Sequence, residues 1–395
     1  MSYQFEFSTV GRIVFGRGQF KRLGELVAEY GRKALVVTNA DRAGKLGLLA
    51  RLAELLAAQN VAHTVFRLEG EPRAEDVDRG VRAAREAECD ALIALGGGSA
   101  LDAAKAIAGL LTNGGEALDY MEVVGRGRKI ARPAAPWVAV PTTAGTGAEV
   151  TRNAVIACVE KQFKASIRSH HLLPRVALVD AELGASVRPE ITARSGMDAL
   201  TQLIEAYTSL GATPLTDVLA LEGLSRARAL RRAYHDGQDL EAREDMALAA
   251  LLSGLCLSNA GLGAVHGFAA PLGARFPAPH GAVCAILLPG VLAANIAALQ
   301  SATDKGAAAS LGRYATVGRL LAPAMAGSLS QELQACVDVT TKLVRELHIP
   351  RLAQYGIGVK DIPALVGAAQ KSSSMRYNPA TLPGEALSAI LHGAL

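Results

Sequence analysis

The sequence predicts an α/β N-terminal domain with a parallel sheet, followed by an all-α C-terminal domain. The chain has 395 residues, and at roughly 100–200 residues per domain this length favours two domains. Strand and helix patterns alternate through the first half, and strand patterns become rare after Thr192. We place the boundary in the turn-rich segment ELGASVRPE, which gives domains 1–184 and 185–395.

The first domain repeats the order strand then helix. FEFSTVGRIVFG (5–16) predicts two short β segments around a turn, and the apolar run ALVVT (34–38) is typical of a strand buried on both faces. The other expected strands are 61–66, 91–99, 137–143 and 176–180, and the expected helices are 20–30, 46–59, 74–87 and 100–112. Repeated β-then-α order implies a parallel sheet with helices on both sides.

The second domain shows helical apolar spacing almost throughout. The main expected helices are 195–209, 215–233, 242–258 and 283–299. Near the C-terminus, Asn378–Pro379 predicts a break, after which a last helix follows.

Composition argues against nucleic-acid and membrane partners. Lys and Arg number 41 against 37 Asp and Glu, the net charge is +4, and 4% of the residues are aromatic. The densest basic group (226–232) has acidic neighbours, which is typical of a solvated helix face. Apolar stretches are interrupted before they reach the roughly 18 residues of a membrane span.

The cysteines and the N-terminus indicate a cytoplasmic protein. The five cysteines are an odd number without CxxC spacing, so a disulfide framework is not expected and a reducing compartment is. MSYQFEFSTVGRIVFG has no basic segment followed by an apolar one, and therefore does not match a signal peptide.

A glycine loop, GGGSALDAAKA (96–106), follows one of the expected strands. Gly97 and Gly98 let the backbone approach a ligand without Cβ clashes, and Ser99 is expected to cap the next helix. Because a helix N-terminus attracts anions, the loop fits a pyrophosphate, and Lys105 is placed to reach an anion too. Taken alone, the loop fits an ordinary glycine-rich turn equally well, and it lacks the GK[ST] of a Walker loop.

A second loop, PTTAGTGAEVTRN (141–153), also follows an expected strand. Thr142 and Thr143 offer hydroxyl and backbone donors to a polar cofactor, although an ordinary Thr/Gly turn has the same composition. Two such loops at the carboxyl ends of strands in one parallel sheet favour a ligand site more than either loop alone.

Four polar residues of the second domain form a candidate metal site. Asp198 and Gln202 are four apart on an expected helix and so project from one face. His266 lies in an apolar helical context, and His280 lies near the start of another helix. A carboxylate, an amide oxygen and two imidazoles suit Fe²⁺ or Zn²⁺. Each residue alone also fits a structural role, so only the joint pattern favours a metal.

Together these motifs resemble the iron-containing (group III) alcohol dehydrogenases, members of the dehydroquinate synthase-like superfamily. The resemblance runs from VFG (14–16) to PHGAVCAILLP (279–289). It implies a dinucleotide-binding α/β domain and a helical metal- and substrate-binding domain. NAD would lie in the cleft between them, with Fe²⁺ or Zn²⁺ on the helical side.

The resemblance also implies roles for individual residues. The glycine loop would hold the pyrophosphate, the two threonines would meet the adenine and ribose, and Lys164 would lie near the nicotinamide ribose. The implied cofactor-binding positions are Asn39, Gly97, Gly98, Ser99, Asp102, Thr142, Thr143 and Lys164, and the implied metal ligands are Asp198, Gln202, His266 and His280.

Three positions depart from the family pattern. Gln202 stands where the family usually has His, and an amide oxygen is a weaker ligand for Fe²⁺ or Zn²⁺. Ala270 stands where many members have a further His, which removes a proton-relay group and leaves no catalytic side chain assigned. Asn39 stands where NAD-preferring members often have Asp, so NADP is an alternative to NAD.

The implied activity is reversible hydride transfer between a small alcohol and its aldehyde or ketone, with a metal ion lowering the pKa of the alcohol. Three alternatives stay open, because a fold does not determine a reaction. They are a metal-independent reductase resembling maleylacetate reductase, a lyase resembling dehydroquinate synthase, and a catalytically decayed nucleotide-binding homologue. The N-terminal β segment is expected to pair with its copy in a homodimer, as in relatives.

Overall fold

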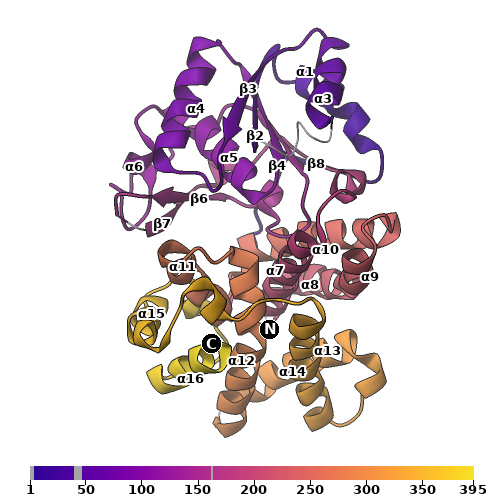
Figure 1. Ribbon diagram of the computed structural model, residues 1–395, viewed down its shortest axis with the longest axis vertical. Coiled ribbons are helices and arrows are strands. Elements are labelled where there is room, and N and C mark those ends of the chain that lie inside the picture. Colours follow the sequence, from indigo (N-terminus) through magenta and orange to yellow (C-terminus); the bar gives the residue numbers. More distant parts are fainter. Residues whose placement is uncertain (1–3, 40–46, 162, 304) are drawn as a thin grey trace. The chain divides into compact units, whose positions relative to one another are not determined.

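A computed structural model describes residues 4–39, 47–161, 163–303 and 305–395 (Figure 1). Contacts within the chain divide it into two units. Ser8–Val187 form an α/β unit, and Arg188–Leu395, together with the segment before Ser8, form a helical unit. The boundary expected at residue 184 lies at the end of the short 3₁₀ helix Ala181–Gly184.

The α/β unit contains a six-stranded sheet with the order β1-β8-β5-β4-β2-β3. Every strand pair in it is parallel, as the alternating strand and helix patterns predicted. The strands are β1 (Arg12–Phe15), β2 (Lys33–Asn39), β3 (Ala62–Leu68), β4 (Ala91–Gly96), β5 (Trp137–Pro141) and β8 (Val176–Val179).

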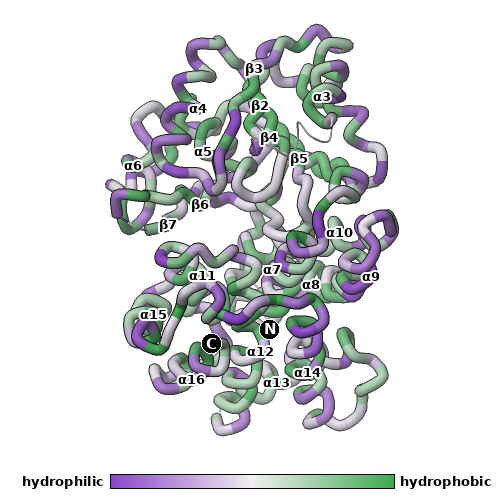
Figure 2. Tube along the Cα trace, viewed as in Figure 1, coloured by the Kyte–Doolittle hydropathy of each residue, from purple (hydrophilic) through white to green (hydrophobic). Residues whose placement is uncertain are grey.

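Helices cover both faces of this sheet. They are α1 (Leu23–Ala28), α3 (Leu48–Ala57), α4 (Ala74–Glu86), α5 (Gly98–Asn113) and α6 (Ala117–Tyr120). Leu35 and Val37 of β2 join a core with α4 and α5, whereas Ala34 and Val36 join a second core with α1 and α3. A strand that alternates between two cores must be apolar throughout, which is why its sequence runs ALVV and appears hydrophobic in Figure 2.

Two strand predictions for this unit were wrong or incomplete. Of the two β segments expected in 5–16, only β1 forms, because RIVF alone finds a partner, β8. An antiparallel pair, β6 (Asn153–Cys158) and β7 (Phe163–Arg168), was not predicted. In β6 the side chains of Ala154, Ile156 and Cys158 are buried while Val155 is exposed, so the hairpin has one covered face.

The second unit is helical, as predicted. Its helices are α7 (Pro189–Thr208), α8 (Pro214–Ala227), α9 (Leu230–His235), α10 (Leu240–Ala260), α11 (Ala264–Arg275), α12 (His280–Ser301), α13 (Lys305–Leu321), α14 (Leu329–Glu346), α15 (Ile362–Gln370) and α16 (Gly384–Ala394). The helix expected at 215–233 is split into α8 and α9 by a turn at Arg228 and Ala229.

Helix α12 is long and apolar enough to cross a membrane, although Gly281, Pro289 and Gly290 interrupt its apolar sequence. Its mean hydropathy is 2.2, but 61% of the apolar window is buried. Buried helices in the centre of a bundle need apolar residues on every side, so burial accounts for this composition.

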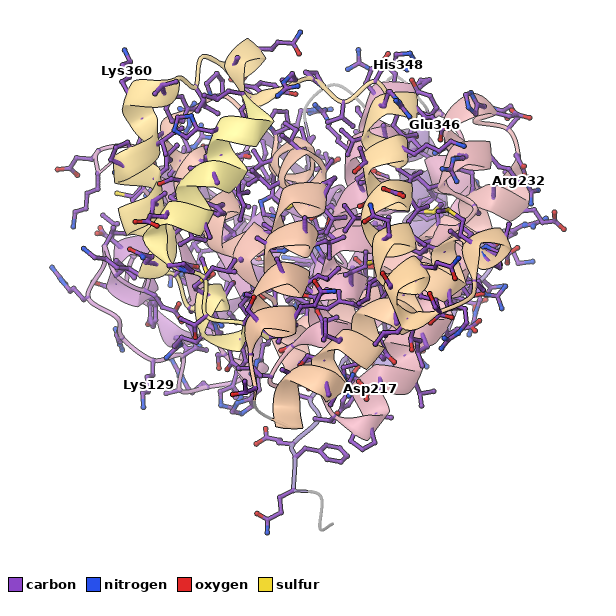
Figure 3. All side chains as sticks on the ribbon, turned by 90° about the horizontal axis from the view of Figure 1, so that it is seen from below. Lys129, Asp217, Arg232, Glu346, His348 and Lys360 are labelled. Atoms are coloured by element: carbon purple, nitrogen blue, oxygen red, sulfur yellow. The ribbon has the colours of Figure 1, made fainter. Side chains whose placement is uncertain are left out.

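Three arginines of the basic group at 226–232, Arg226, Arg231 and Arg232, form ion pairs with acidic side chains. Arg226 contacts Glu222 and Asp245. Arg231 contacts Glu346 at 2.6 Å, and Figure 3 labels Glu346 on the outer surface of the helical unit. These ion pairs agree with the solvated helix face expected from the sequence.

Candidate functional site

The two predicted loops and Asn39 meet at the carboxyl edge of the parallel sheet. Strand β4 lies between β2 and β5, so the ends of these three strands are neighbours. Asn39 is the last residue of β2, and Gly96 at the end of β4 pairs with Pro141 of β5. After β2 the chain continues to β3, on one side along the sheet, and after β4 it continues to β5, on the other side. Such a reversal of strand order forms the usual ligand crevice of parallel α/β sheets.

The glycines at this edge allow the loops to approach closely. A Cβ atom on Gly97 would lie 3.1 Å from Thr143 Oγ1, and one on Gly98 would lie 2.9 Å from Thr146 Cγ2. A Cβ atom on Gly96 would lie 3.0 Å from Asn39 Oδ1. The structure therefore brings together the glycine loop and the threonine loop, as their positions after strands of one parallel sheet indicated, and it places Asn39 beside the glycine loop.

The prediction that Ser99 caps the following helix was wrong. Helix α5 begins at Gly98, its N-cap is Gly97, and the cap makes no side-chain hydrogen bond. Ser99 therefore lies within the first turn. Because the first N–H groups of a helix have no partner inside it, a bare glycine N-cap leaves this N-terminus suited to an anion.

Lys105 contacts groups of the protein itself, including Asp102 Oδ1 at 3.6 Å, instead of reaching out to a ligand anion as expected from the sequence. The side chain is fully buried, and its Nζ donates to the Ala148 and Asn153 carbonyls and to Thr151 Oγ1 at 2.7–2.9 Å. Asp102 Oδ2 accepts from the Val155 N–H at 3.1 Å. Lys105 and Asp102 of α5 therefore form hydrogen bonds that hold residues 148–155 against this helix.

Ionisation of Glu149, a buried residue of this loop, is expected to make the stability of the protein depend on pH. The residue is 3% exposed, and burial raises its pKa from 4.5 to about 7. A carboxyl whose pKa is higher in the folded than in the unfolded state stabilises the fold only while it is protonated. The free energy of unfolding therefore decreases as pH rises from 4.5 to about 7. We expect Glu149→Gln to have the same unfolding free energy as the parent at pH 5 and a higher one at pH 8. The expected difference is about 1.4 kcal/mol for each unit by which burial raises the pKa of Glu149.

Denaturant unfolding of both proteins at the two pH values measures this difference. Glu122→Gln, at a half-exposed position, is the matched control and should show no such change with pH. An equal stability difference at pH 5 and pH 8 would refute the role of Glu149 ionisation.

Lys164 lies on β7 of the hairpin and forms an ion pair with Glu71. Its side chain is 20% exposed, so the ammonium group retains access to solvent. Its implied place near the nicotinamide ribose stays a prediction.

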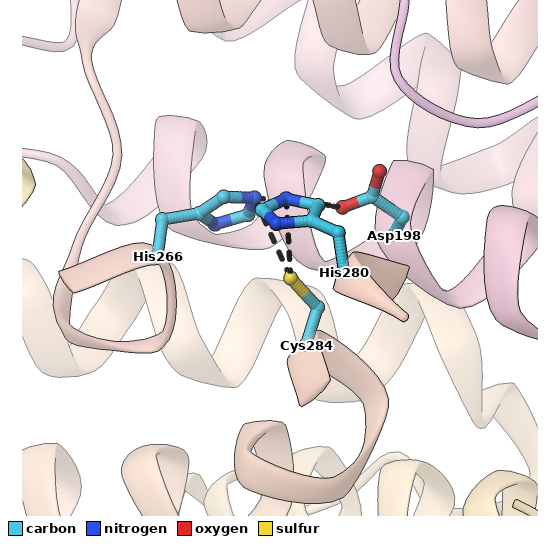
Figure 4. A group of neighbouring side chains, drawn as sticks. All are labelled: Asp198, His266, His280 and Cys284. Carbon is cyan, nitrogen blue, oxygen red and sulfur yellow. Dashed lines mark hydrogen bonds and ion pairs between the residues drawn. The ribbon is translucent and has the colours of Figure 1, made fainter. Parts of the chain in front are cut away.

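Three of the four expected metal-binding residues come together inside the helical unit (Figure 4). Asp198 projects from α7, His266 from α11 and His280 from the first residue of α12. Asp198 Oδ1 lies 3.5 Å from His266 Nε2 and 3.6 Å from His280 Nε2. The fourth member of the observed cluster is Cys284, whose Sγ lies 3.7 Å from each of these nitrogens.

Cys284 was not predicted, because Gln202, four residues after Asp198, already supplied a fourth donor. A signal was present, since His280 and Cys284 are four apart and so share one face of α12. Gln202, which had been expected to complete the site, is 2% exposed, and its Oε1 accepts a hydrogen bond from Ser253 Oγ at 2.8 Å.

Asp198 and the two histidines shift one another's pKa values. Burial opposes ionisation, but the His280 and His266 imidazoles hold the pKa of Asp198 below its ordinary value. Partial desolvation opposes protonation of His280, whose side chain is 44% exposed, yet Cys284 and Asp198 raise its pKa to about 9. A cation bound among these groups would replace protons on the imidazoles, so its affinity is expected to increase with pH.

Glu205 orients one of the imidazoles. Its Oε2 lies 2.6 Å from His266 Nδ1, and its Oε1 accepts from the Val265 N–H at 2.7 Å. Both side chains are less than 10% exposed. A carboxylate on Nδ1 keeps the proton there and leaves Nε2 unprotonated for a cation, which is a common support of metal-binding histidines.

We expect Glu205→Gln to weaken metal binding about 10–100-fold, as is usual for partners that orient a ligand. Isothermal titration with Zn²⁺ measures the affinity, and the pH profile of binding should shift because the amide no longer fixes the tautomer of His266. Glu332→Gln, another buried glutamate of this unit, is the control. Equal Zn²⁺ affinity and equal pH profiles would contradict the positioning role.

The donor set fits a divalent cation. Asp198 Oδ1 is buried and accepts no hydrogen bond from the described residues, and it faces two imidazole nitrogens. Such an oxygen is costly to bury unless a cation or proton satisfies it. A parallel α/β unit with a crevice at its carboxyl edge suits a dinucleotide, and this cluster in the helical unit suits a divalent cation, a combination typical of the class of metal-linked, dinucleotide-dependent enzymes.

Comparison with known proteins narrows this class. The chain matches the family described as iron-containing alcohol dehydrogenase over residues 11–181, and the C-terminal part of the Fe-containing alcohol dehydrogenase family over residues 192–395. It is 35% identical to lactaldehyde reductase of Escherichia coli (strain K12), over 96% of this chain and 97% of that protein.

Solved structures agree over the full length. The crystal structure of 1,3-propanediol oxidoreductase superimposes with a TM-score of 0.91 at 32% identity, covering 100% of both chains. Sulfoacetaldehyde reductase from Bifidobacterium kashiwanohense, in complex with NAD⁺, superimposes with a TM-score of 0.85 at 27% identity, covering 100% of this chain and 99% of that one. The chain belongs to the iron-containing alcohol dehydrogenase family. This confirms the resemblance and the fold class inferred from the sequence.

Proposed function

We propose that this protein is a metal-dependent, NAD-linked oxidoreductase that interconverts a small alcohol with its aldehyde or ketone by hydride transfer. The observation that carries the proposal is the convergence of Asp198, His266 and His280 around a buried carboxylate oxygen that accepts no hydrogen bond from any described residue, in a chain of the iron-containing alcohol dehydrogenase family. The same three residues would hold the divalent cation.

The α/β unit would bind the dinucleotide through the residues at its carboxyl edge. The N–H groups at the start of α5 would receive the pyrophosphate, and Gly97 and Gly98 keep this surface free of side chains. Thr142, Thr143 and Asp102 would contact the rest of the cofactor, and Lys164 the nicotinamide ribose.

When bound, the cation supplies Lewis acidity that lowers the pKa of an alcohol and polarises a carbonyl. Glu205 holds His266 in orientation, and the 44% exposed side chain of His280 keeps the cluster accessible from solvent. Ala270, within α11, has no group that could carry a proton, so a proton would have to pass through water or through another side chain.

We propose a small substrate that is uncharged or carries a single charge. The relatives of this chain include reductases of lactaldehyde and sulfoacetaldehyde. We propose NAD as the main cofactor and Fe²⁺ or Zn²⁺ as the metal. NADP remains an alternative because Asn39 has no charge to repel a 2′-phosphate.

We also propose a cytoplasmic homodimer. All five cysteines are free thiols, which fits a reducing compartment. Strand β1 is at the edge of the sheet and its Ile13 is 38% exposed, so this edge is a candidate for pairing with a second copy. Sedimentation velocity gives the oligomeric state.

The activity is tested by following NADH and NADPH at their absorption band with a panel of small alcohols and aldehydes. Assays would use protein stripped by a chelator and then reloaded with Fe²⁺ or Zn²⁺. We expect turnover only after reloading. Full activity of the stripped protein would favour a metal-independent reductase instead, and the lack of turnover under every condition would favour a decayed homologue.

A further inference from the structure

We propose that Cys284 is the fourth protein ligand of the cation, in the place that the sequence assigned to Gln202. The inference rests on the proposed function, because it assumes that Asp198, His266 and His280 hold a divalent cation. It concerns the ligand set of this chain, in which a sulfur would accompany one oxygen and two nitrogens.

Four of the six distances between the donor atoms of the cluster match the edges of a tetrahedron. For ligand bonds of about 2.0–2.3 Å, tetrahedral geometry places the donor atoms about 3.3–3.8 Å apart. Asp198 Oδ1 lies 3.5 and 3.6 Å from the two Nε2 atoms, and Cys284 Sγ lies 3.7 Å from both. All four atoms lie within 4.8 Å of one another.

The backbone places Cys284 there without strain. His280 and Cys284 are separated by one turn of α12, so their side chains leave the same face of the helix. Cys284 is fully buried, and its sulfur contacts both imidazoles, as Figure 4 shows. A buried thiol in contact with two histidine nitrogens and close to a carboxylate oxygen is surrounded by metal-binding groups.

Gln202 is engaged elsewhere. Its Oε1, the atom that would bind a cation, accepts from Ser253 Oγ on α10. An amide oxygen is also a poor ligand for Fe²⁺ and Zn²⁺, whereas a thiolate is among the strongest. Cys284 therefore compensates for the missing histidine at position 202, and it shifts the preference of the site towards Zn²⁺ and other thiophilic ions.

Cobalt substitution tests this ligand set without reference to activity. Apo-protein titrated with Co²⁺ should show the near-ultraviolet charge-transfer band of a thiolate–Co²⁺ bond. Cys284→Ser and Cys284→Ala should lose the band and bind Co²⁺ at least about tenfold more weakly. X-ray absorption of the Zn²⁺ form should show one sulfur at about 2.3 Å in the parent and none in these variants.

Matched variants separate the alternatives. Cys336→Ala removes another fully buried thiol of the helical unit, and Gln202→Leu removes the amide at similar volume. Both should keep the band and a parental Co²⁺ affinity. If Gln202→Leu loses the metal while Cys284→Ala retains it, the assignment is wrong.

The failure of this inference is distinct from the failure of the proposed function. Co²⁺ binding that is lost in His266→Ala but shows no sulfur band in the parent would overturn the role of Cys284 alone. If the parent binds no Co²⁺ and keeps full activity after chelation, then the metal-dependent function and the Cys284 assignment both fail.

Discussion

His266→Ala should lose its bound cation and at least about 10³-fold in kcat/KM, because a metal acting as a Lewis acid is worth several kcal/mol of transition-state stabilisation. The imidazole supplies Nε2 to the cluster and is held by Glu205, so the substitution removes one of the donor atoms of the site. Metal content after gel filtration and the rate of NADH formation are the two measurements.

The substitution also leaves Glu205 without its imidazole partner, so folding must be separated from metal loss. His280→Ala serves this purpose, because the His280 side chain is 44% exposed and its removal costs little packing. His392→Ala, at an exposed position of the same unit, is the neutral control. If both cluster variants keep the metal and parental kcat/KM, these histidines do not hold the cation.

The sequence predicted the α/β unit well because the central strands β2, β4, β5 and β8 are buried on both faces. Such strands need continuous apolar runs, and these stand out beside polar loops, as at 34–38 and 91–95. The β6–β7 hairpin has the opposite character. Its buried residues alternate with exposed ones over only six positions in each strand, and the positions between them include apolar residues such as Val155. The alternation is therefore weak evidence without a known partner.

Residues of the candidate site could be predicted from the sequence where they belong to a short motif on a single helix or loop. Asp198 and the histidines follow from short motifs, and the close approach of Asn39 to the glycine loop follows from the parallel order of the strands. The role of Gln202 depends on the direction of a flexible side chain, and Ser253, 51 residues away, determines that direction. Such a contact is a property of helix packing between α7 and α10, which helical periodicity alone does not reveal.

Helix packing at the cluster leads to the second large effect, which is expected for Gly281→Ala. Gly281 follows His280 in the first turn of α12, where this helix meets α7. A Cβ atom there would lie 2.2 Å from the Arg194 carbonyl oxygen and 3.3 Å from Asp198 Cβ. Because backbone atoms cannot rotate away, the methyl group would force α12 and α7 apart by about 1 Å, and overpacking of this kind costs about 1–3 kcal/mol.

The same displacement would separate His280 Nε2 from Asp198 Oδ1, which are 3.6 Å apart and come from these two helices. We therefore expect Gly281→Ala to lose more than about tenfold in metal affinity, beyond its loss of stability, because ligands must keep their distances within about 0.2 Å. Thermal unfolding and Zn²⁺ titration measure the two effects separately. Gly312→Ala is the control, since a Cβ atom on Gly312 of α13 meets nothing within 4 Å and alanine favours the helix. A Gly281→Ala protein that is less stable but binds Zn²⁺ as the parent does would show that the cluster tolerates this movement, and that Gly281 serves packing alone.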